Sequence, residues 1–238
     1  ATVVVPFNDA AAVEAALAAG DVACVLTEPA LTNCGLVPPL PGVLHAVQDA
    51  CRRTGTLFVL DETHTVSAGL GGHTRQERLA PDFLVVGKAV AGGVPCAVYG
   101  FGDETAARMQ RAKDEAPPGH SGIGTTLSAS LLALAALEAS LREVMTADAY
   151  RRMEAVAAPL ADGLAGVIAA AGLPWTVTRL GARMELQFAA RTPRSAAEAR
   201  AAMHDDLERA LQLWLLNRGI VVTPFHNMLL VPPVAAPG

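Results

Sequence analysis

The stretch Phe58-Val59-Leu60-Asp61-Glu62-Thr63-His64-Thr65 joins a run of large apolar residues to two carboxylates and an imidazole. A second apolar run, Phe83-Leu84-Val85-Val86, is followed directly by Gly87 and Lys88. Short, continuous apolar runs are typical of strands that are buried on both faces of a parallel sheet. Ligands bind at the carboxyl ends of such strands, so Asp61 and Lys88 stand where chemistry is expected.

Strand and helix patterns alternate around this stretch, which predicts an α/β domain with a mostly parallel sheet. The expected strands cover residues 3–5, 22–27, 56–60, 83–86 and 96–99, and the expected helices cover residues 9–19, 41–53 and 127–144.

The pattern changes near residue 146. Residues 175–179 and 184–188 alternate apolar and polar side chains, as half-exposed antiparallel strands do. Further helices are expected over residues 147–171 and 195–217, and further strands over residues 221–222 and 228–231. The sequence therefore predicts two domains, residues 1–145 and a smaller α+β domain with antiparallel strands, residues 146–238.

Composition and charge limit the class of protein. The chain has 238 residues, of which 52% are hydrophobic and 17% charged, so an ordered protein with a buried core is expected. The net charge is -5, and no basic cluster extends beyond Arg52-Arg53 and Arg151-Arg152, which argues against a nucleic-acid partner. Apolar runs such as residues 131–137 are shorter than a membrane span, and the first residues lack a signal pattern. These features predict a soluble, cytoplasmic protein without a membrane partner.

Cysteine and histidine spacing gives no strong metal signal. The four cysteines contain no CxxC pair and suit free thiols in a reducing compartment: Cys24, Cys34, Cys51 and Cys96. Asp61, His64 and His73 leave a metal site open, but their spacing is not diagnostic, so no metal is predicted.

The run Asp61-Glu62-Thr63-His64 also matches the DExH box of helicase-type ATPases. Those enzymes need a phosphate loop of the form GxxxxGK[ST]. Here Gly87-Lys88 is followed by Ala89 and has no glycine at the required offset before it. The ATPase interpretation is therefore rejected.

Lysine is rare in this chain: of the 18 lysine and arginine residues, only Lys88 and Lys113 are lysines. A lysine at the mouth of an apolar strand is partly desolvated, which favours the neutral, nucleophilic amine, whereas an arginine stays protonated. Amine chemistry at Lys88 is one interpretation. An exposed lysine, or an ion pair between Lys88 and Asp61, remains the other.

Taken in order, these residues resemble the class III (subgroup II) aminotransferases, which depend on pyridoxal 5'-phosphate (PLP) and have fold type I. The branch that contains glutamate-1-semialdehyde aminomutase is the nearest in character. Supporting motifs surround the Asp61 and Lys88 strands: Pro6-Phe7-Asn8-Asp9, Glu28-Pro29, Asn33-Cys34-Gly35, Pro38-Pro39, Pro81-Asp82 and Gly124-Thr125-Thr126-Leu127-Ser128.

The resemblance assigns roles to single residues. It implies that Lys88 forms the Schiff base with PLP and moves protons during catalysis, and that Asp61 pairs with the pyridine nitrogen. It implies that Thr126, with Thr125, reaches the phosphate of a cofactor shared across a homodimer interface. Two positions depart from the family pattern: Thr63 replaces a valine against the ring, and His64 replaces a Gln or Met near the phenolic oxygen.

Substrate-binding residues are expected from the same resemblance. Glu28 and Asn33 follow a predicted strand and either line the pocket or cap the loop. Arg183 and His226 lie in the second predicted domain, where the family places groups for a substrate carboxylate, and an arginine binds a carboxylate in bidentate fashion. An exposed strand residue is the alternative for Arg183.

The expected activity is transfer of an amino group between an amino acid or amine and a keto or aldehyde acceptor. An aminomutase, which is an isomerase, uses the same chemistry and remains an alternative. The chain resembles only the later part of such an enzyme, without the segment that carries the main phosphate-binding helix. A non-catalytic remnant or fragment of the fold is therefore the second alternative.

Overall fold

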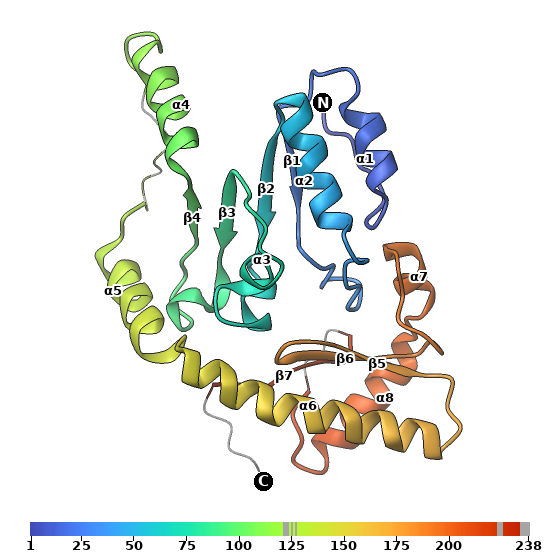
Figure 1. The fold of residues 1–238 in the computed structure, drawn as a ribbon. Helices are drawn as coiled ribbons and strands as arrows, with labels where there is room; N and C mark the ends of the chain where they lie inside the picture. The colour runs from blue at the N-terminus through green and yellow to red at the C-terminus, as the bar shows by residue number, and fades with distance from the viewer. Residues whose placement is uncertain (121–123, 125, 127, 223–225, 234–238) are drawn as a thin grey trace.

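The computed structural model describes residues 1–120, 124, 126, 128–222 and 226–233 (Figure 1). A four-stranded sheet carries the first part of the chain, with its strands in the order β1 (Cys24–Thr27), β2 (Leu57–Asp61), β3 (Phe83–Val86) and β4 (Val98–Phe101). β1, β2 and β3 are parallel, and β4 runs antiparallel to β3. The register pairs Asp61 with Val85, so the carboxyl ends of β2 and β3 lie together.

Two helices pack on one face of this sheet, α1 (Ala10–Leu17) and α2 (Val43–Thr54). The core between them is made of aliphatic and aromatic side chains that are almost fully buried: Val13, Leu17, Leu44, Val47, Phe58 and Leu60. α2 ends at Gly55, whose φ of 70° is a left-handed conformation that glycine adopts at little cost.

Short helical segments follow the strand ends, and longer helices lie beyond the edge strand β4 (Figure 1). In chain order they are η1 (Thr65–Ala68), α3 (Gly72–Gln76), η2 (Lys88–Ala91), α4 (Asp103–Asp114), α5 (Leu131–Ala139) and the π-helical η3 (Ser140–Val144). η1 and α3 follow β2, and η2 follows β3, so these segments surround the carboxyl ends of the parallel strands.

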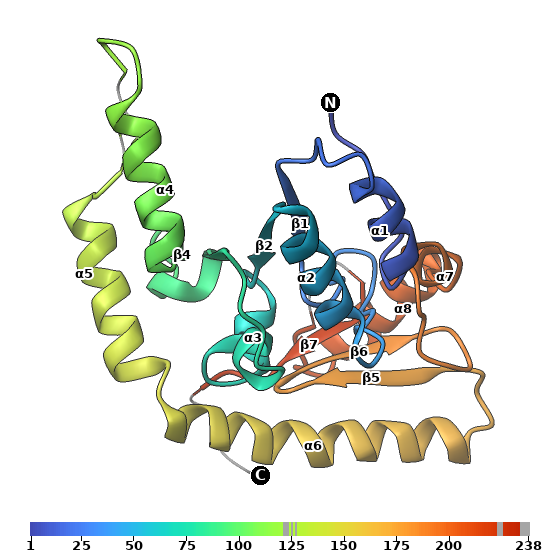
Figure 2. The ribbon, with the colours of Figure 1, turned by 45° about the horizontal axis from the view of Figure 1, so that its top comes forward.

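A second sheet is antiparallel and has the order β5 (Thr176–Leu180), β6 (Arg183–Gln187) and β7 (Met228–Leu230). α6 (Ala147–Ala170) runs along this sheet, and α7 (Ala196–Ala201) and α8 (Asp205–Leu216) follow β6 (Figure 2). Met153, Ala157 and Ala161 of α6 form one buried cluster with Met184.

Three side chains join the second sheet and its helix to loops of the first. Tyr150 donates its hydroxyl to the Val66 carbonyl at 2.8 Å, and Gln187 donates to the Leu36 carbonyl at 3.0 Å. Asn8 donates to the Arg194 carbonyl at 2.9 Å. Residues 36 and 66 follow β1 and β2, so the second sheet is held against the strand ends of the first.

Several predicted elements differ from the structure. Residues 3–5 and 221–222 are not strands, and Val3 and Val4 are exposed. The single helix predicted over residues 195–217 is two helices, because α7 ends at Ala201 and His204 caps a new helix by accepting a hydrogen bond from the Leu207 N–H. α4 was not predicted: only its Thr105 is buried, so it has little apolar periodicity.

The helix predicted over residues 127–144 begins at Leu131, and Leu127 lies outside the described residues. α6 is the one helix in the described part of the chain with the length and apolar composition to cross a membrane. Core helices of soluble proteins, which are mostly buried, pass the same test, whereas 22% of the apolar window of α6 is buried. The buried residues of α6 contact β6.

Candidate active site

Lys88 and Asp61 lie at the carboxyl ends of two adjacent parallel strands. Asp61 is the last residue of β2 and accepts a hydrogen bond from the Thr63 N–H at 2.9 Å, which uses one of its two carboxylate oxygens. Lys88 follows β3, and its side chain is exposed. Its φ of 52° is left-handed, a conformation that costs a non-glycine residue about 1–2 kcal/mol and that recurs at functional sites.

Gly87 allows the β2 and β3 ends to approach closely. It is buried, and a Cβ atom there would lie 3.3 Å from Thr63 Oγ1 and 3.5 Å from Ala97 Cβ. A larger residue at position 87 would push on Thr63. Gly87 and Thr63 therefore set the distance between the segments that follow β2 and β3, beside Lys88.

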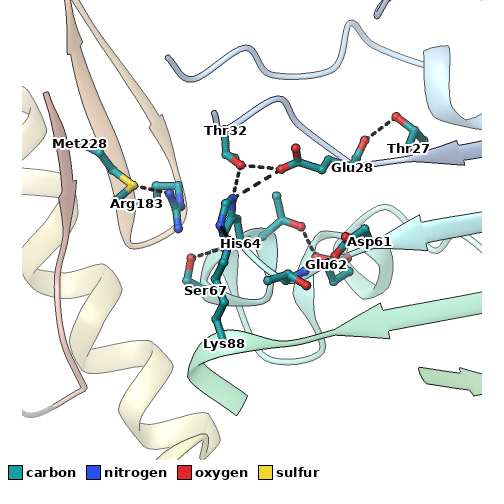
Figure 3. Close-up of polar contacts among 12 residues, drawn as sticks. Thr27, Glu28, Thr32, Asp61, Glu62, His64, Ser67, Lys88, Arg183 and Met228 are labelled. Carbon is teal, nitrogen blue, oxygen red and sulfur yellow. Dashed lines mark hydrogen bonds and ion pairs between the residues drawn. The ribbon is translucent and has the colours of Figure 1, made fainter. Parts of the chain in front are cut away.

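A chain of polar side chains leads away from the Lys88 amine (Figure 3). Lys88 Nζ contacts His64 Nε2, and His64 Nδ1 lies 2.5 Å from Thr32 Oγ1. Thr32 Oγ1 also donates to Glu28 Oε2 at 2.5 Å, and Glu28 Oε2 lies 3.7 Å from His64 Nδ1. Three predicted site residues, Lys88, His64 and Glu28, are thus brought together.

Glu62 holds the loop that carries His64. It is 1% exposed, and its carboxylate accepts hydrogen bonds from the Thr65 hydroxyl, the His73 N–H, and both the N–H and the hydroxyl of Thr74. These partners come from η1 and α3, so one buried carboxylate ties together the segment from residue 62 to residue 74.

Arg183 lies in β6 and is buried. The alternative interpretation, that Arg183 is an exposed strand residue, is therefore wrong. Its Nη1 contacts Met228 Sδ, and its Nε has no hydrogen-bond partner in the described part of the chain. Burial lowers the pKa of the Arg183 guanidinium, and the nearby carboxylates of Glu185 and Glu28 raise it. An under-satisfied guanidinium near Glu28 suits a ligand carboxylate.

Other predicted site residues are not joined to this cluster. Asn33 and Thr126 are exposed, and Thr125 lies outside the described residues. Cys24, Cys34, Cys51 and Cys96 are free thiols, and no group of three or more metal-binding side chains occurs within the described ranges.

Two features of the site were not found from the sequence. Thr32 was not among the predicted site residues, although a hydroxyl four residues after Glu28 is the signal that links the two side chains. Glu185, buried in β6, pairs with buried His226 at 2.7 Å. Burial raises the pKa of the Glu185 carboxyl, and His226 lowers it.

The chain matches the family described as aminotransferase class-III over residues 5–235. It belongs to this family. A glutamate-1-semialdehyde 2,1-aminomutase 2 of Brevibacillus brevis is 36% identical over 228 residues, which are 94% of this chain and 51% of the relative. A glutamate-1-semialdehyde 2,1-aminomutase of Sorangium cellulosum is 38% identical and is covered to 50%. The chain therefore spans about half the length of the curated relatives it matches.

Solved structures of an aminomutase and an aminotransferase agree with this chain in fold. A glutamate-1-semialdehyde-aminomutase from Pseudomonas aeruginosa PAO1 is 46% identical, with a TM-score of 0.92 over 98% of this chain and 52% of that one. A variant of the same protein, with a lysine replaced by alanine, was solved in complex with PMP. A β-phenylalanine aminotransferase from Variovorax paradoxus is 27% identical, with a TM-score of 0.83 over 98% of this chain and 53% of that one. The fold type I architecture predicted from the sequence, with a mostly parallel sheet and a separate antiparallel sheet, is confirmed.

Proposed function

We propose that this chain carries the lysine and the carboxylate of a PLP-dependent enzyme that transfers an amino group between an amino acid or amine and a keto or aldehyde acceptor. The observation that carries the proposal is the position of Lys88 and Asp61 at adjacent strand ends, in a chain that matches the class-III family over residues 5–235.

The side chains present fit PLP at two of its functional groups. The Lys88 amine is exposed and suits the aldehyde, and the Asp61 carboxylate suits a protonated pyridine nitrogen because a negative charge favours the protonated form. Thr126, with Thr125, would hold the phosphate. When bound, PLP would supply an electron sink for the pair that a substrate carbon keeps when it loses a proton.

Each residue then has a defined task. Lys88 Nζ binds the cofactor and afterwards holds the proton that leaves the substrate carbon, returning it at the position that receives it. Asp61 would keep the pyridine nitrogen charged, and Thr63, at the position of the family's valine, would contact the ring. Arg183 orients the substrate through its carboxylate. Glu28 lies near Arg183, and Asn33 follows Glu28 on the same loop, so both are proposed to contact the substrate.

An aminomutase is the second candidate, favoured by the 46% identity to the Pseudomonas aeruginosa aminomutase and by the names of the curated relatives. An aminomutase returns the amino group to the same molecule, so it consumes no separate keto acid. Conversion of glutamate-1-semialdehyde without an added acceptor would favour the aminomutase, whereas strict dependence on an acceptor would favour the aminotransferase.

The test uses the purified protein and PLP. We expect an absorption band in the visible region and, after borohydride reduction, a pyridoxyl adduct on the peptide that contains Lys88. Lys88→Ala removes both, whereas Lys113→Arg on the exposed helix α4 is the matched control and retains both. Absence of a band, or labelling spread equally over Lys88 and Lys113, would mean that this chain alone does not act as a PLP enzyme and would support a fragment or a non-catalytic remnant of the fold.

We also propose that the protein is cytoplasmic and forms a homodimer with shared active sites. The chain is proposed to consist of two domains, residues 1–145 and 146–238. Leu131, Leu132 and Leu134 of α5 are exposed, which suits an interface. Light scattering on a size-exclusion column tests the dimer, and a monomer at micromolar concentration would contradict it.

A further inference from the structure

The contacts of His64 connect the Lys88 amine to a carboxylate that belongs to another strand. His64 follows β2, Lys88 follows β3, and Glu28 and Thr32 follow β1, so three neighbouring strand ends contribute to one line of polar atoms (Figure 3). Thr32 is 3% exposed, and the His64 side chain is 16% exposed, so water has little access to the middle of the line.

The groups along this line differ in their ability to donate or accept, which sets the donor and the acceptor of each hydrogen bond. A charged lysine can only donate, so His64 Nε2 must accept from Lys88 Nζ. The imidazole proton is then on Nδ1 and is donated to Thr32 Oγ1. The Thr32 hydroxyl proton is donated in turn to the Glu28 carboxylate, which can only accept.

We propose that His64 is a positioning residue that accepts the proton Lys88 must lose, and that Thr32 and Glu28 hold its ring ready to do so. In this step one N–H bond of Lys88 Nζ breaks, its electron pair stays on Nζ, and a new N–H bond forms at His64 Nε2. The hydrogen bonds from Nδ1 to Thr32 and from Thr32 to Glu28 keep their direction. Only the later use of the neutral amine, in binding PLP, rests on the proposed function.

The surrounding charges favour this assignment. The Glu28 carboxylate lies 3.7 Å from His64 Nδ1 and compensates a positive charge on the ring. Arg183 of β6 opposes it from the facing sheet, but Glu185 also lies near Arg183 and offsets its charge.

The test compares the two lysines in the cofactor-free protein. Acetic anhydride reacts with neutral amines, and mass spectrometry of the peptides gives the labelling ratio of Lys88 to Lys113. Lys113 is exposed on α4 and serves as the internal standard. His64→Gln should lower the ratio at pH 7.5 about tenfold, because the variant lacks the base that takes a proton from Lys88 Nζ while the amine is acylated.

A pair of substitutions at Thr32 separates proton transfer from packing. Thr32→Val keeps the shape and removes the hydroxyl, so the ratio should fall as in His64→Gln, whereas Thr32→Ser restores the hydroxyl and should restore the ratio. Unchanged ratios in His64→Gln and Thr32→Val would overturn the proposal even if PLP labels Lys88. Altered ratios without any PLP adduct would leave the proton step standing and overturn the proposed function.

Discussion

Glu62 is the side chain on which the loop beside Lys88 depends. It accepts four hydrogen bonds while almost fully buried, and three of its donors belong to residues 73 and 74. Glu62→Gln keeps the shape but turns an acceptor oxygen into a donor that faces N–H and O–H groups. We expect a loss of about 2–3 kcal/mol in the free energy of unfolding, measured by urea denaturation, because a buried donor is left unpaired.

Glu77 provides the control for this prediction because it is an exposed glutamate of the same segment. Glu77→Gln should change the free energy of unfolding by less than about 0.5 kcal/mol. Equal effects of the two substitutions would show that the Glu62 hydrogen bonds do not hold the loop.

His73 makes the same segment sensitive to acid. It is buried, and neither ring nitrogen has a hydrogen-bond partner in the described structure. Burial lowers the pKa of the His73 imidazole below 6.5, although Glu77 and Glu62 raise it. The unfolded chain therefore binds more protons just below pH 6.5, so stability is lost as the pH falls from 6.5 towards the lowered pKa of the folded state.

His73→Phe should remove this acid sensitivity. We expect the urea midpoint of the wild type to fall more between pH 7.5 and pH 5.5 than that of the variant. Parallel pH profiles would mean that His73 is not the group responsible.

The strands of the parallel sheet were easier to predict than the exposed helix α4, for a physical reason. β1, β2 and β3 are short apolar runs between polar ends, and the structure confirms each of them with small shifts at the ends. α4 is mostly exposed, so its sequence carries no apolar stripe, and only acidic residues at its start and basic ones at its end indicate a helix. The break before α8 depends on the cap at His204, which a periodic pattern does not reveal.

α6 contains a proline in its interior. Pro159 is exposed, and its ring removes the backbone hydrogen bond that a helix would otherwise make to Ala155. Pro159→Ala should raise the free energy of unfolding by about 1–3 kcal/mol, since alanine favours a helix interior and proline disfavours it. Thermal denaturation followed by circular dichroism at 222 nm measures the effect. An unchanged or lower melting temperature would mean that the helix is bent at Pro159 to fit β5 and β6.

Site residues at the ends of the parallel strands could be predicted from the sequence. Contacts between the two sheets could not. Asp61 and Lys88 follow from their positions at the ends of apolar runs. Contacts such as Gln187 with the Leu36 carbonyl join residues 151 positions apart, so no local pattern indicates them. The burial of Arg183 and Glu185 is a consequence of this packing.

Gly181 is the point where the second sheet fits most tightly against the loops of the first. It lies in the turn between β5 and β6 with a φ of 58°, and a Cβ atom there would lie 1.9 Å from the Ala68 carbonyl oxygen of η1. Gly172 has a similar φ of 63° but has no atom within 4 Å of its Cβ position. Comparing alanine at the two positions therefore separates backbone strain from the contact between the sheets.

Gly172→Ala should cost about 1 kcal/mol of unfolding free energy, the price of a left-handed alanine. Gly181→Ala should cost about 1–3 kcal/mol more, because the Ala68 backbone must move. We expect faster amide hydrogen exchange over residues 65–68 in Gly181→Ala only, since η1 would separate from the turn. Similar exchange and similar losses in the two variants would show that the sheets are not held together at this turn. The Lys88 site would then depend on the other contacts between them, those of Tyr150, Gln187 and Asn8.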